Sequence, residues 1–380
     1  MLRDLTVTIL RGLIWVLRLL AAPLLRLRLR RRDKSERLLA LRGFGSQHAI
    51  CFIGRVSEDL AMAEHDTPGE PHRHLLHRLR DAYRLLISRP VPNANVEIAY
   101  AGRRWQMTSD DSGLLFDCFE LDGAPARPMW QGYEARLLTP AEPGDEVKST
   151  GEVFMLPPTA QRVIISDLDD TVIFTGVANK LMMFWRLFAA TAQERVPFPG
   201  VAEFYRGLHA GAADGGEGNP IIYVSRSPWS IYPTLDAFFR MHRIPTGPIL
   251  MLRDWGITYR DPLPRRAPEH KDEMIDMVLR VYPDLPVVLV GDSGQRDPEV
   301  YTGLAERHPG RIAAIYIRDL EQSDSRTREL ADMGARLSRQ GIDFVSAPDT
   351  AALAEHAAGR GWLETGGKHE TRRAAAGGRV

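Results

Sequence analysis

The sequence has little of several features that would decide its class at once. Its 380 residues include only two cysteines, Cys51 and Cys118, which are too few for a disulfide framework or a zinc site. A reducing compartment is therefore the default expectation. A hydrophobic content of 44% and a charged content of 26% exclude a multi-span membrane protein and wholesale disorder. The length predicts two or three domains.

The sequence also lacks net charge, because 49 basic residues balance 49 acidic ones. The balance is a sum of opposites. Residues 1–34 carry nine basic and two acidic residues, a net charge of +7, so the other 346 residues carry −7 (40 basic against 47 acidic). The zero therefore hides a basic N-terminal segment and a mildly acidic body.

The same segment is apolar from Leu5 to Leu29, and helical spacing gathers Arg3, Arg11 and Arg18 on one arc. We predict a basic amphipathic helix at a membrane interface, with Arg30–Arg32 favouring anionic lipid. A tilted span would bury Arg11 and Arg18, and the longest uncharged run is only Leu19–Leu25. A signal peptide is disfavoured, because the segment has neither an unbroken apolar region nor a clear cleavage site. The remaining alternative is a helix packed on the body through its apolar face.

The body changes character along the chain. Residues 35–45 are predicted to be a connector, and residues 46–157 a helix plus a small β-sandwich domain. Turn-forming residues there separate short β-type runs, the predicted strands Ala49–Ile53, Val96–Tyr100, Trp105–Thr108, Leu114–Phe119, Tyr133–Leu138 and Val147–Met155. No chemical motif is visible in this domain, so we expect it to mediate interaction or placement.

Residues 158–350 alternate apolar strand runs with helical stretches, which predicts a parallel sheet with helices on both faces. The predicted strands are Val163–Ser166, Ile221–Val224, Ile249–Leu252, Val287–Val290, Ile312–Ile317 and Asp343–Val345, with a helix at Thr327–Arg339. Residues 366–380 are rich in Gly, Ala and Arg and are predicted to be a disordered tail.

Polar residues suited to phosphate chemistry follow three of these strands. Asp167-Leu168-Asp169-Asp170-Thr171 follows the first, Ser225 the second, and Asp292 the fourth, with Asp297 five residues later. Lys271 opens the helix between the last two. Because ligands bind beyond the carboxyl ends of parallel strands, these residues should converge. Each alone has an ordinary structural explanation; Asp297-Pro298, for example, is a good helix start with Asp as N-cap.

The order D-x-D-x-T, Ser, Lys, G-D-x4-D resembles the haloacid dehalogenase superfamily of phosphotransferases. A response-regulator receiver domain also uses acidic residues, a Ser or Thr and a Lys. Its Lys is the last of these residues, however, whereas here an acidic pair follows Lys271. The blocks Ile165–Thr171, Tyr223–Trp229, His270-Lys271 and Gly291–Glu299 look like the catalytic domain of the yeast actin-patch-associated phosphatidate phosphatase family and its bacterial relatives. The resemblance covers roughly residues 150–320, and Arg226 stands where family members often have Asn.

The resemblance implies a role for each matched residue. Asp167 would be the nucleophile that forms an aspartyl-phosphate, and Asp169 would protonate the leaving alkoxide and then activate water. Ser225 and Lys271 would hold the phosphoryl oxygens. Mg2+ would be bound at a site made by Asp167, Asp169, Asp292 and Asp297, an oxygen-rich set of the kind this ion prefers.

The sequence as a whole predicts an α/β enzyme: a haloacid-dehalogenase-like parallel sheet, a small β-sandwich domain before it, and an N-terminal basic amphipathic helix. The motifs indicate a Mg2+-dependent phosphomonoesterase. The family resemblance, together with the basic N-terminal segment, implies that it hydrolyses phosphatidate to diacylglycerol and phosphate. Expected partners are the phospholipid substrate and an anionic membrane surface, with no nucleic acid, at the cytoplasmic face of a membrane as a peripheral protein. The alternatives are a phosphatase for a soluble or protein phosphomonoester and a non-catalytic membrane-associated scaffold.

Overall fold

The computed structural model describes residues 36–58, 90–121, 129–138, 146–168, 171–172, 197–211, 218–225, 227, 229–251, 270–320 and 323–363. The predicted segment 1–34, the helix predicted from helical spacing at residues 72–88, the tail 366–380, Asp169 and Arg226 lie outside these residues. Among the described helices, none is long and apolar enough to cross a membrane.

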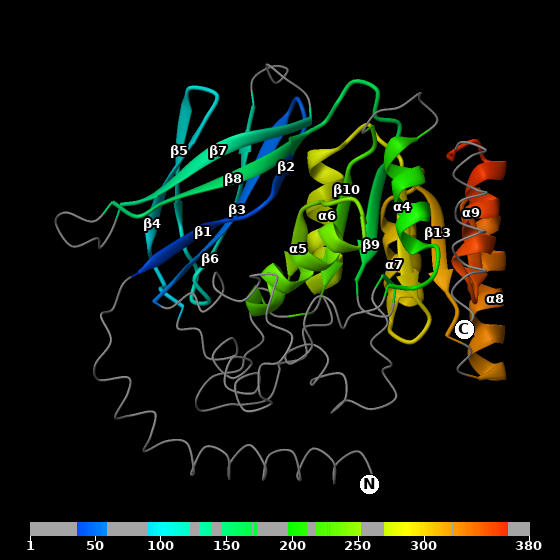
Figure 1. Ribbon diagram of the computed structural model, residues 1–380. Coiled ribbons are helices and arrows are strands. Elements are labelled where there is room, and N and C mark those ends of the chain that lie inside the picture. The colour runs from blue at the N-terminus through cyan, green and yellow to red at the C-terminus, as the bar shows by residue number, and fades with distance from the viewer. Residues whose placement is uncertain are drawn as a thin grey trace, which may run out of the picture.

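The described chain forms two sheets that stand side by side (Figure 1). The first sheet is built from eight strands, nearly all antiparallel: β1 (Arg37–Ala40), β2 (Gly43–Gly45), β3 (Ala49–Ser57), β4 (Asn95–Tyr100), β5 (Arg103–Thr108), β6 (Leu114–Glu120), β7 (Met129–Leu137) and β8 (Lys148–Met155). The exception is the parallel pair of β2 and β8. Where we expected a sandwich of two sheets, one continuous hydrogen-bonded sheet curls until β5 and β6 lie close together.

One feature of this sheet differs from the sequence prediction. The expected connector at residues 35–45 contains β1 and β2, which pair with β3. These strands are only four and three residues long, too short for a clear alternation of apolar and polar residues. The hairpin between β4 and β5 turns on Ala101 and Gly102, both with positive φ (49° and 78°), the conformation that a tight two-residue turn requires.

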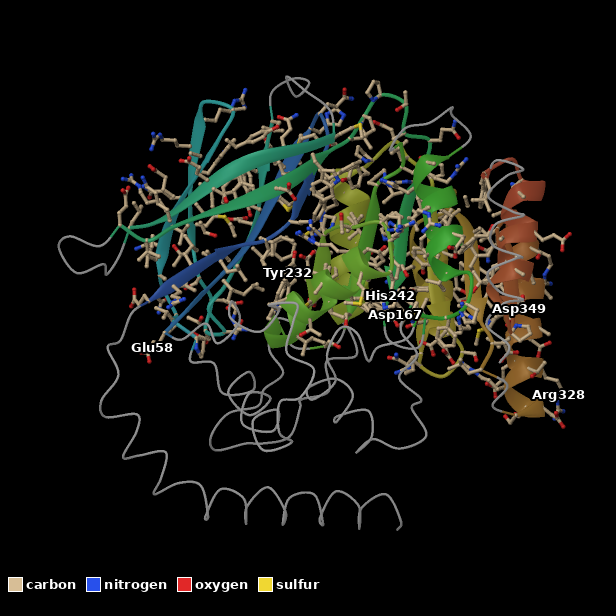
Figure 2. The ribbon with its side chains drawn as sticks, viewed as in Figure 1. Glu58, Asp167, Tyr232, His242, Arg328 and Asp349 are labelled. Carbon is tan, nitrogen blue, oxygen red and sulfur yellow. A yellow bond between two sulfur atoms is a disulfide. The ribbon has the colours of Figure 1, made fainter. Side chains whose placement is uncertain are left out.

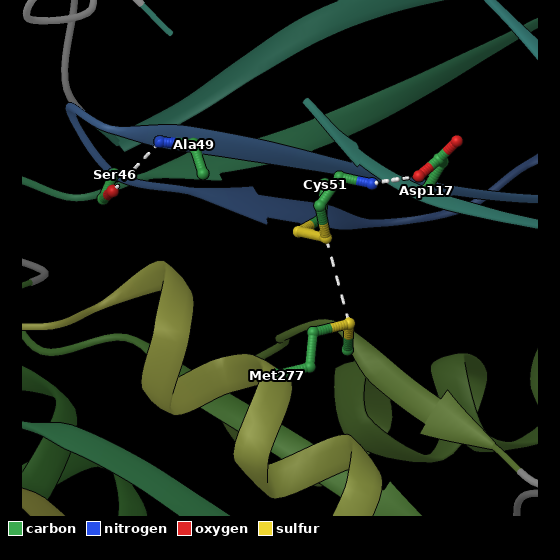
Figure 3. Close-up of a disulfide and its surroundings, with 6 residues drawn as sticks. Ser46, Ala49, Cys51, Asp117 and Met277 are labelled. Atoms are coloured by element: carbon green, nitrogen blue, oxygen red, sulfur yellow. Dashed lines mark hydrogen bonds between the residues drawn. A yellow bond between two sulfur atoms is a disulfide. The ribbon is translucent and has the colours of Figure 1, made fainter. Parts of the chain in front are cut away.

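The two cysteines are joined to each other, which the default of a reducing compartment did not predict. Cys51 on β3 and Cys118 on β6 are register partners on neighbouring strands and form a disulfide across 67 residues of sequence. Figure 3 shows the bond facing helix α6 (His270–Val281), where the Met277 Sδ atom lies 3.8 Å from the Cys118 Sγ atom. The disulfide therefore lies where the first sheet packs against the second part of the chain.

The second sheet has six parallel strands in the order β11-β10-β9-β12-β13-β14. Their bounds are β9 (Val163–Asp167), β10 (Ile221–Ser225), β11 (Ile249–Met251), β12 (Val287–Asp292), β13 (Ile312–Arg318) and β14 (Asp343–Ala347). The central strands are buried throughout, which explains their continuous runs of Val, Ile and Leu. All six strands predicted from the sequence are confirmed, to within two residues at each end.

Helices connect these strands, and one more follows the last strand: α4 (Val201–Ala210), α5 (Tyr232–Met241) after a short 3-10 turn at Trp229–Ile231, α6, α7 (Asp297–Arg307), α8 (Asp324–Ser338) and, after β14, α9 (Thr350–Gly359). Neighbouring residues of a strand point to opposite faces of its sheet. Ser166 contacts Tyr205 on α4, whereas Asp167 contacts Lys271 on α6. The predicted helices therefore do cover both faces of the parallel sheet.

The two sheets share one hydrophobic core. Phe44, Ile53 and Leu114 from the first sheet belong to the same buried cluster as Ile164 and Ile165 of β9. A second cluster lies inside the first sheet and includes Phe52 and Tyr133. Arg42, buried between β1 and β2, forms an ion pair with Asp236 on α5 and so joins the two parts. The parallel sheet is thus held in place from one side by the first sheet.

Candidate active site

The predicted site residues lie at the carboxyl edge of the parallel sheet. Asp167 ends β9, Ser225 ends β10 and Asp292 ends β12. The strand register sets Val224 beside Asp167, so Ser225 comes one residue further along the edge. Figure 2 shows Asp167 at the lower end of the central strands. As expected for parallel strands, the sheet brings residues that are over 100 positions apart in sequence to one edge.

Lys271 connects two of the three carboxylates. It is the second residue of α6, and its Nζ atom donates to Asp167 Oδ1 at 2.7 Å and to Asp297 Oδ1. All three side chains are at most 1% exposed. Burial alone would lower the pKa of Lys271, but the charges and hydrogen bonds of Asp167 and Asp297 outweigh burial and raise that pKa above its ordinary value. The ammonium group therefore stays charged at any physiological pH.

Asp292 is held by backbone groups instead. Its Oδ1 atom accepts from the N–H groups of Gly294 at 2.7 Å and Gln295 at 2.9 Å. Burial, together with the nearby Asp297 charge, raises the pKa of Asp292 to about 7, against the opposing influence of Lys271 and the two N–H groups. Among the described residues, Lys271 forms its ion pairs with Asp167 and Asp297, and no cation forms an ion pair with Asp292.

The three carboxylates can share one cation. One oxygen each from Asp167, Asp292 and Asp297 lies within 4.8 Å of the others, and all three residues are buried. Gly291 allows this close approach, since a Cβ atom there would stand 2.6 Å from Asp297 Oδ2 and 2.8 Å from a Tyr301 ring carbon. Three carboxylates against one ammonium leave an excess of negative charge, and hard oxygen donors are those that Mg2+ binds. The donor set therefore fits a divalent cation.

The structure thus brings together four of the predicted residues, Asp167, Lys271, Asp292 and Asp297, and places Ser225 on the adjacent strand. The Ser225 Oγ atom accepts from the Ser227 N–H at 3.0 Å. Asp169 lies outside the described residues. The prediction that Asp297 is a helix N-cap is wrong: Arg296 is the N-cap of α7, and Asp297 is the next residue. The Asp297 carboxylate instead accepts from Lys271 and from the Asp292 N–H at 3.3 Å.

Sequence reasoning missed the residues behind the site. Ser166 precedes Asp167, is fully buried, and forms a 2.6 Å hydrogen bond with the Tyr205 hydroxyl group. A signal existed, because Ser166 is a polar residue at the end of the apolar run Val163–Ile165. Gly294 and Gln295 were also missed, since they contribute backbone N–H groups that no side-chain pattern reveals.

The raised pKa of Asp292 predicts a pH-dependent stability in the metal-free protein. Between about pH 4 and pH 7 the folded state binds a proton that the unfolded state releases, so the free energy of unfolding should fall as pH rises, by about 1 kcal/mol per pH unit. Denaturant titrations at pH 5, 6 and 7 measure this slope. Asp292→Asn should remove this contribution and Mg2+ should flatten the curve; parallel curves for both proteins would contradict the prediction.

Known proteins match this part of the chain. Residues 162–319 match the family model described as the catalytic domain of phosphatidate phosphatase APP1. Phosphatidate phosphatase APP1 of Saccharomyces cerevisiae is 32% identical over 220 residues, which cover 57% of this chain and 35% of that protein. An uncharacterised protein of Schizosaccharomyces pombe is 29% identical over 157 residues, covering 41% of this chain and 25% of that protein. The matched stretches thus span only 35% and 25% of the length of these two relatives.

The solved structures that align with this chain are too dissimilar to indicate its fold. A carbohydrate acetylesterase from Xanthomonas citri aligns with 90% of this chain and 74% of its own, but at 11% identity and a TM-score of 0.27. The sequence matches are specific by comparison, because the matched stretch contains every predicted site residue from Asp167 to Asp297. Residues 162–319 are therefore similar to the catalytic domain of a phosphatidate phosphatase.

Proposed function

We propose that this protein is a phosphatidate phosphatase that releases phosphate and diacylglycerol through an aspartyl-phosphate. The observation that carries the proposal is the buried cluster of Asp167, Asp292, Asp297 and Lys271 at the carboxyl edge of the sheet, in a stretch similar to such a catalytic domain. The D-x-D-x-T motif that begins at Asp167, with the Ser, Lys and acidic pair after it, supports a haloacid-dehalogenase-like enzyme. Burial at the end of a strand favours a reacting group, since it excludes water from the nucleophile.

In the first step an Asp167 carboxylate oxygen would attack phosphorus, and the bond between phosphorus and the diacylglycerol oxygen would break. Asp169, two residues on, would donate a proton to the leaving alkoxide. Asp169 would then take a proton from water, whose oxygen attacks phosphorus and displaces the Asp167 oxygen, so that inorganic phosphate leaves. Two displacements at one carboxylate return the protein to its starting state.

The other residues would stabilise charge during both displacements. Lys271, fixed beside the Asp167 carboxylate, offsets negative charge on the phosphoryl oxygens, and Ser225 offers a hydroxyl group from the neighbouring strand. Mg2+ would be held by Asp167 and Asp292, with Asp297 and the Asp169 carbonyl in support, and it would polarise the phosphoryl group when bound. The excess of carboxylates in the described cluster is the structural support for this ion.

A lipid substrate is supported by two independent features. One is the similarity of residues 162–319 to a phosphatidate phosphatase catalytic domain. The other is the +7 charge of residues 1–34 among apolar residues, which favours an anionic membrane surface. The proposed location is therefore peripheral, at a membrane. Attachment to the cytoplasmic face of the membrane stays a prediction. Because Cys51 and Cys118 form a disulfide, the number of cysteines no longer supports a reducing compartment.

A substrate panel tests the proposal. The purified full chain with Mg2+ is offered phosphatidate in anionic vesicles, soluble phosphate monoesters and phosphopeptides, and phosphate release is measured with and without EDTA. We expect phosphatidate to be turned over with the highest kcat/KM and EDTA to abolish the reaction. Equal or better turnover of soluble esters would overturn the lipid substrate, and no release from any substrate would favour the scaffold.

A further inference from the structure

A chain of buried hydroxyl groups lies directly behind the proposed nucleophile. Ser166 Oγ donates to the Asp167 backbone carbonyl oxygen at 2.6 Å and lies 2.6 Å from the Tyr205 hydroxyl oxygen. A serine hydroxyl group has one hydrogen, and here it is given to the carbonyl. The Tyr205 hydroxyl group must therefore donate to Ser166, which fixes the direction of the chain from α4 through Ser166 to the Asp167 carbonyl.

The surroundings keep this chain rigid. Ser166 is fully buried and Tyr205 is 1% exposed, so water does not compete for their hydrogen bonds. The Tyr205 ring packs edge-on against Phe204 and parallel to Tyr223, with ring centroids 5.8 Å and 6.2 Å away. Burial raises the pKa of Tyr205 well beyond its ordinary value, so that the hydroxyl group keeps its proton.

The acceptor of this chain is the peptide group that joins Asp167 to the turn after β9. The orientation of that peptide sets two things, the direction of the Asp167 side chain and the path of the backbone toward Asp169. Lys271 restrains the Asp167 carboxylate from the opposite face of the sheet at 2.7 Å. Asp167 is thus fixed from both faces: its carboxylate from α6, and its carbonyl from α4.

We propose that Tyr205 and Ser166 are positioning residues that orient the Asp167–Leu168 peptide for phosphoryl transfer. They lie behind Asp167 and act through its backbone carbonyl group. A displacement of about 1 Å at a reacting group can lower a rate by roughly two orders of magnitude, so a loosened peptide should affect the chemical step more than substrate binding. The inference rests on the proposed phosphatase reaction.

The test compares two tyrosines that differ in what their hydroxyl groups contact. Tyr205→Phe removes the donor to Ser166, whereas Tyr223→Phe removes a buried hydroxyl group on the neighbouring ring that donates to the Pro245 carbonyl at 2.8 Å. Both variants should show similar decreases in melting temperature. We expect Tyr205→Phe to lower kcat for phosphatidate about tenfold with KM nearly unchanged, and Tyr223→Phe to leave kcat within about twofold of the unmodified chain.

A second variant and a crystal structure complete the experiment. Ser166→Ala should lower kcat at least as much as Tyr205→Phe, and the double variant should be no slower than Ser166→Ala, because the two groups act in series. The structure of Tyr205→Phe should show a rotated Asp167–Leu168 peptide. An unchanged peptide, or an equal loss of kcat in Tyr205→Phe and Tyr223→Phe, would overturn the inference. A wild-type chain that releases no phosphate would overturn the proposed function. In that case the crystal structure of Tyr205→Phe would still show whether Tyr205 orients the Asp167–Leu168 peptide.

Discussion

Replacing Asp167 with asparagine is expected to lower phosphate release from phosphatidate by roughly a thousandfold or more, because a carboxamide is a poor nucleophile toward phosphorus. The substitution keeps the size of the side chain. It also leaves Lys271 paired with Asp297, so the fold should be retained. The measurements are kcat with vesicular substrate and, after acid quenching, the phosphate that stays on the protein from radiolabelled phosphatidate.

A matched control comes from α6, the helix that also carries Lys271. Asp276 is a partly exposed carboxylate that pairs with His308 Nε2 at 2.8 Å. Asp276→Asn should leave kcat within about twofold, since a partly exposed contact of this kind contributes little to stability. If Asp167→Asn kept a tenth of the wild-type rate, or if labelled phosphate stayed on it as on the wild-type chain, Asp167 would not be the nucleophile.

Lys271→Met is expected to have the largest effect on stability. The Lys271 ammonium group pairs with Asp167 at 2.7 Å and with Asp297, and among the described residues it is the only cation within ion-pair distance of Asp297. Removing one partner of a buried ion pair leaves uncompensated charge, which costs about 3–5 kcal/mol of unfolding free energy. The measurement is denaturant unfolding of the metal-free protein, compared with Lys148→Met. Lys148 pairs with Glu146 while 52% of its side chain is exposed, so its loss should cost about 1 kcal/mol or less.

Two further measurements distinguish the effect of removing the Lys271 charge from the effect of removing the packing of its side chain. Adding Asp297→Asn to Lys271→Met removes the Asp297 charge that has lost its ion-pair partner, and it should restore part of the unfolding free energy. Lowering the pH toward 5 should also narrow the difference from wild type, because the buried carboxylates can then bind protons. If neither change restored stability, the lost packing of the lysine side chain rather than its charge would explain the result.

The fold could be predicted where burial leaves a simple mark on the sequence. Strands buried on both faces need continuous apolar runs, so β9, β10 and β12 were found within two residues. The short strands β1 and β2 were not found, since their pairing depends on β3 and β8, which are distant in sequence. Likewise, helix α8 begins three residues before its predicted start, because the Ser323 side chain caps it by accepting from the Arg326 N–H.

The site could be predicted as a set of residues but not as a geometry. The order of Asp167, Lys271, Asp292 and Asp297 indicated convergence at one edge of the sheet. Which carboxylates share the lysine depends on packing, and so does the choice of Asp297 as its second partner over Asp292. The support from Tyr205 could not be seen either, because a tyrosine in an amphipathic helix most often serves the hydrophobic core.

The hydrophobic core shared by the two sheets makes the folding unit longer than the catalytic stretch. Leu41, Phe44 and Ile53 pack against the parallel sheet although they precede residue 162 by more than 100 positions. An isolated fragment of residues 162–319 would turn that face toward water and would also lack β14 and α9. The two parts are therefore expected to unfold in one cooperative transition. A fusion protein that carried residues 162–319 would need another surface of matching shape to cover the exposed face of the parallel sheet.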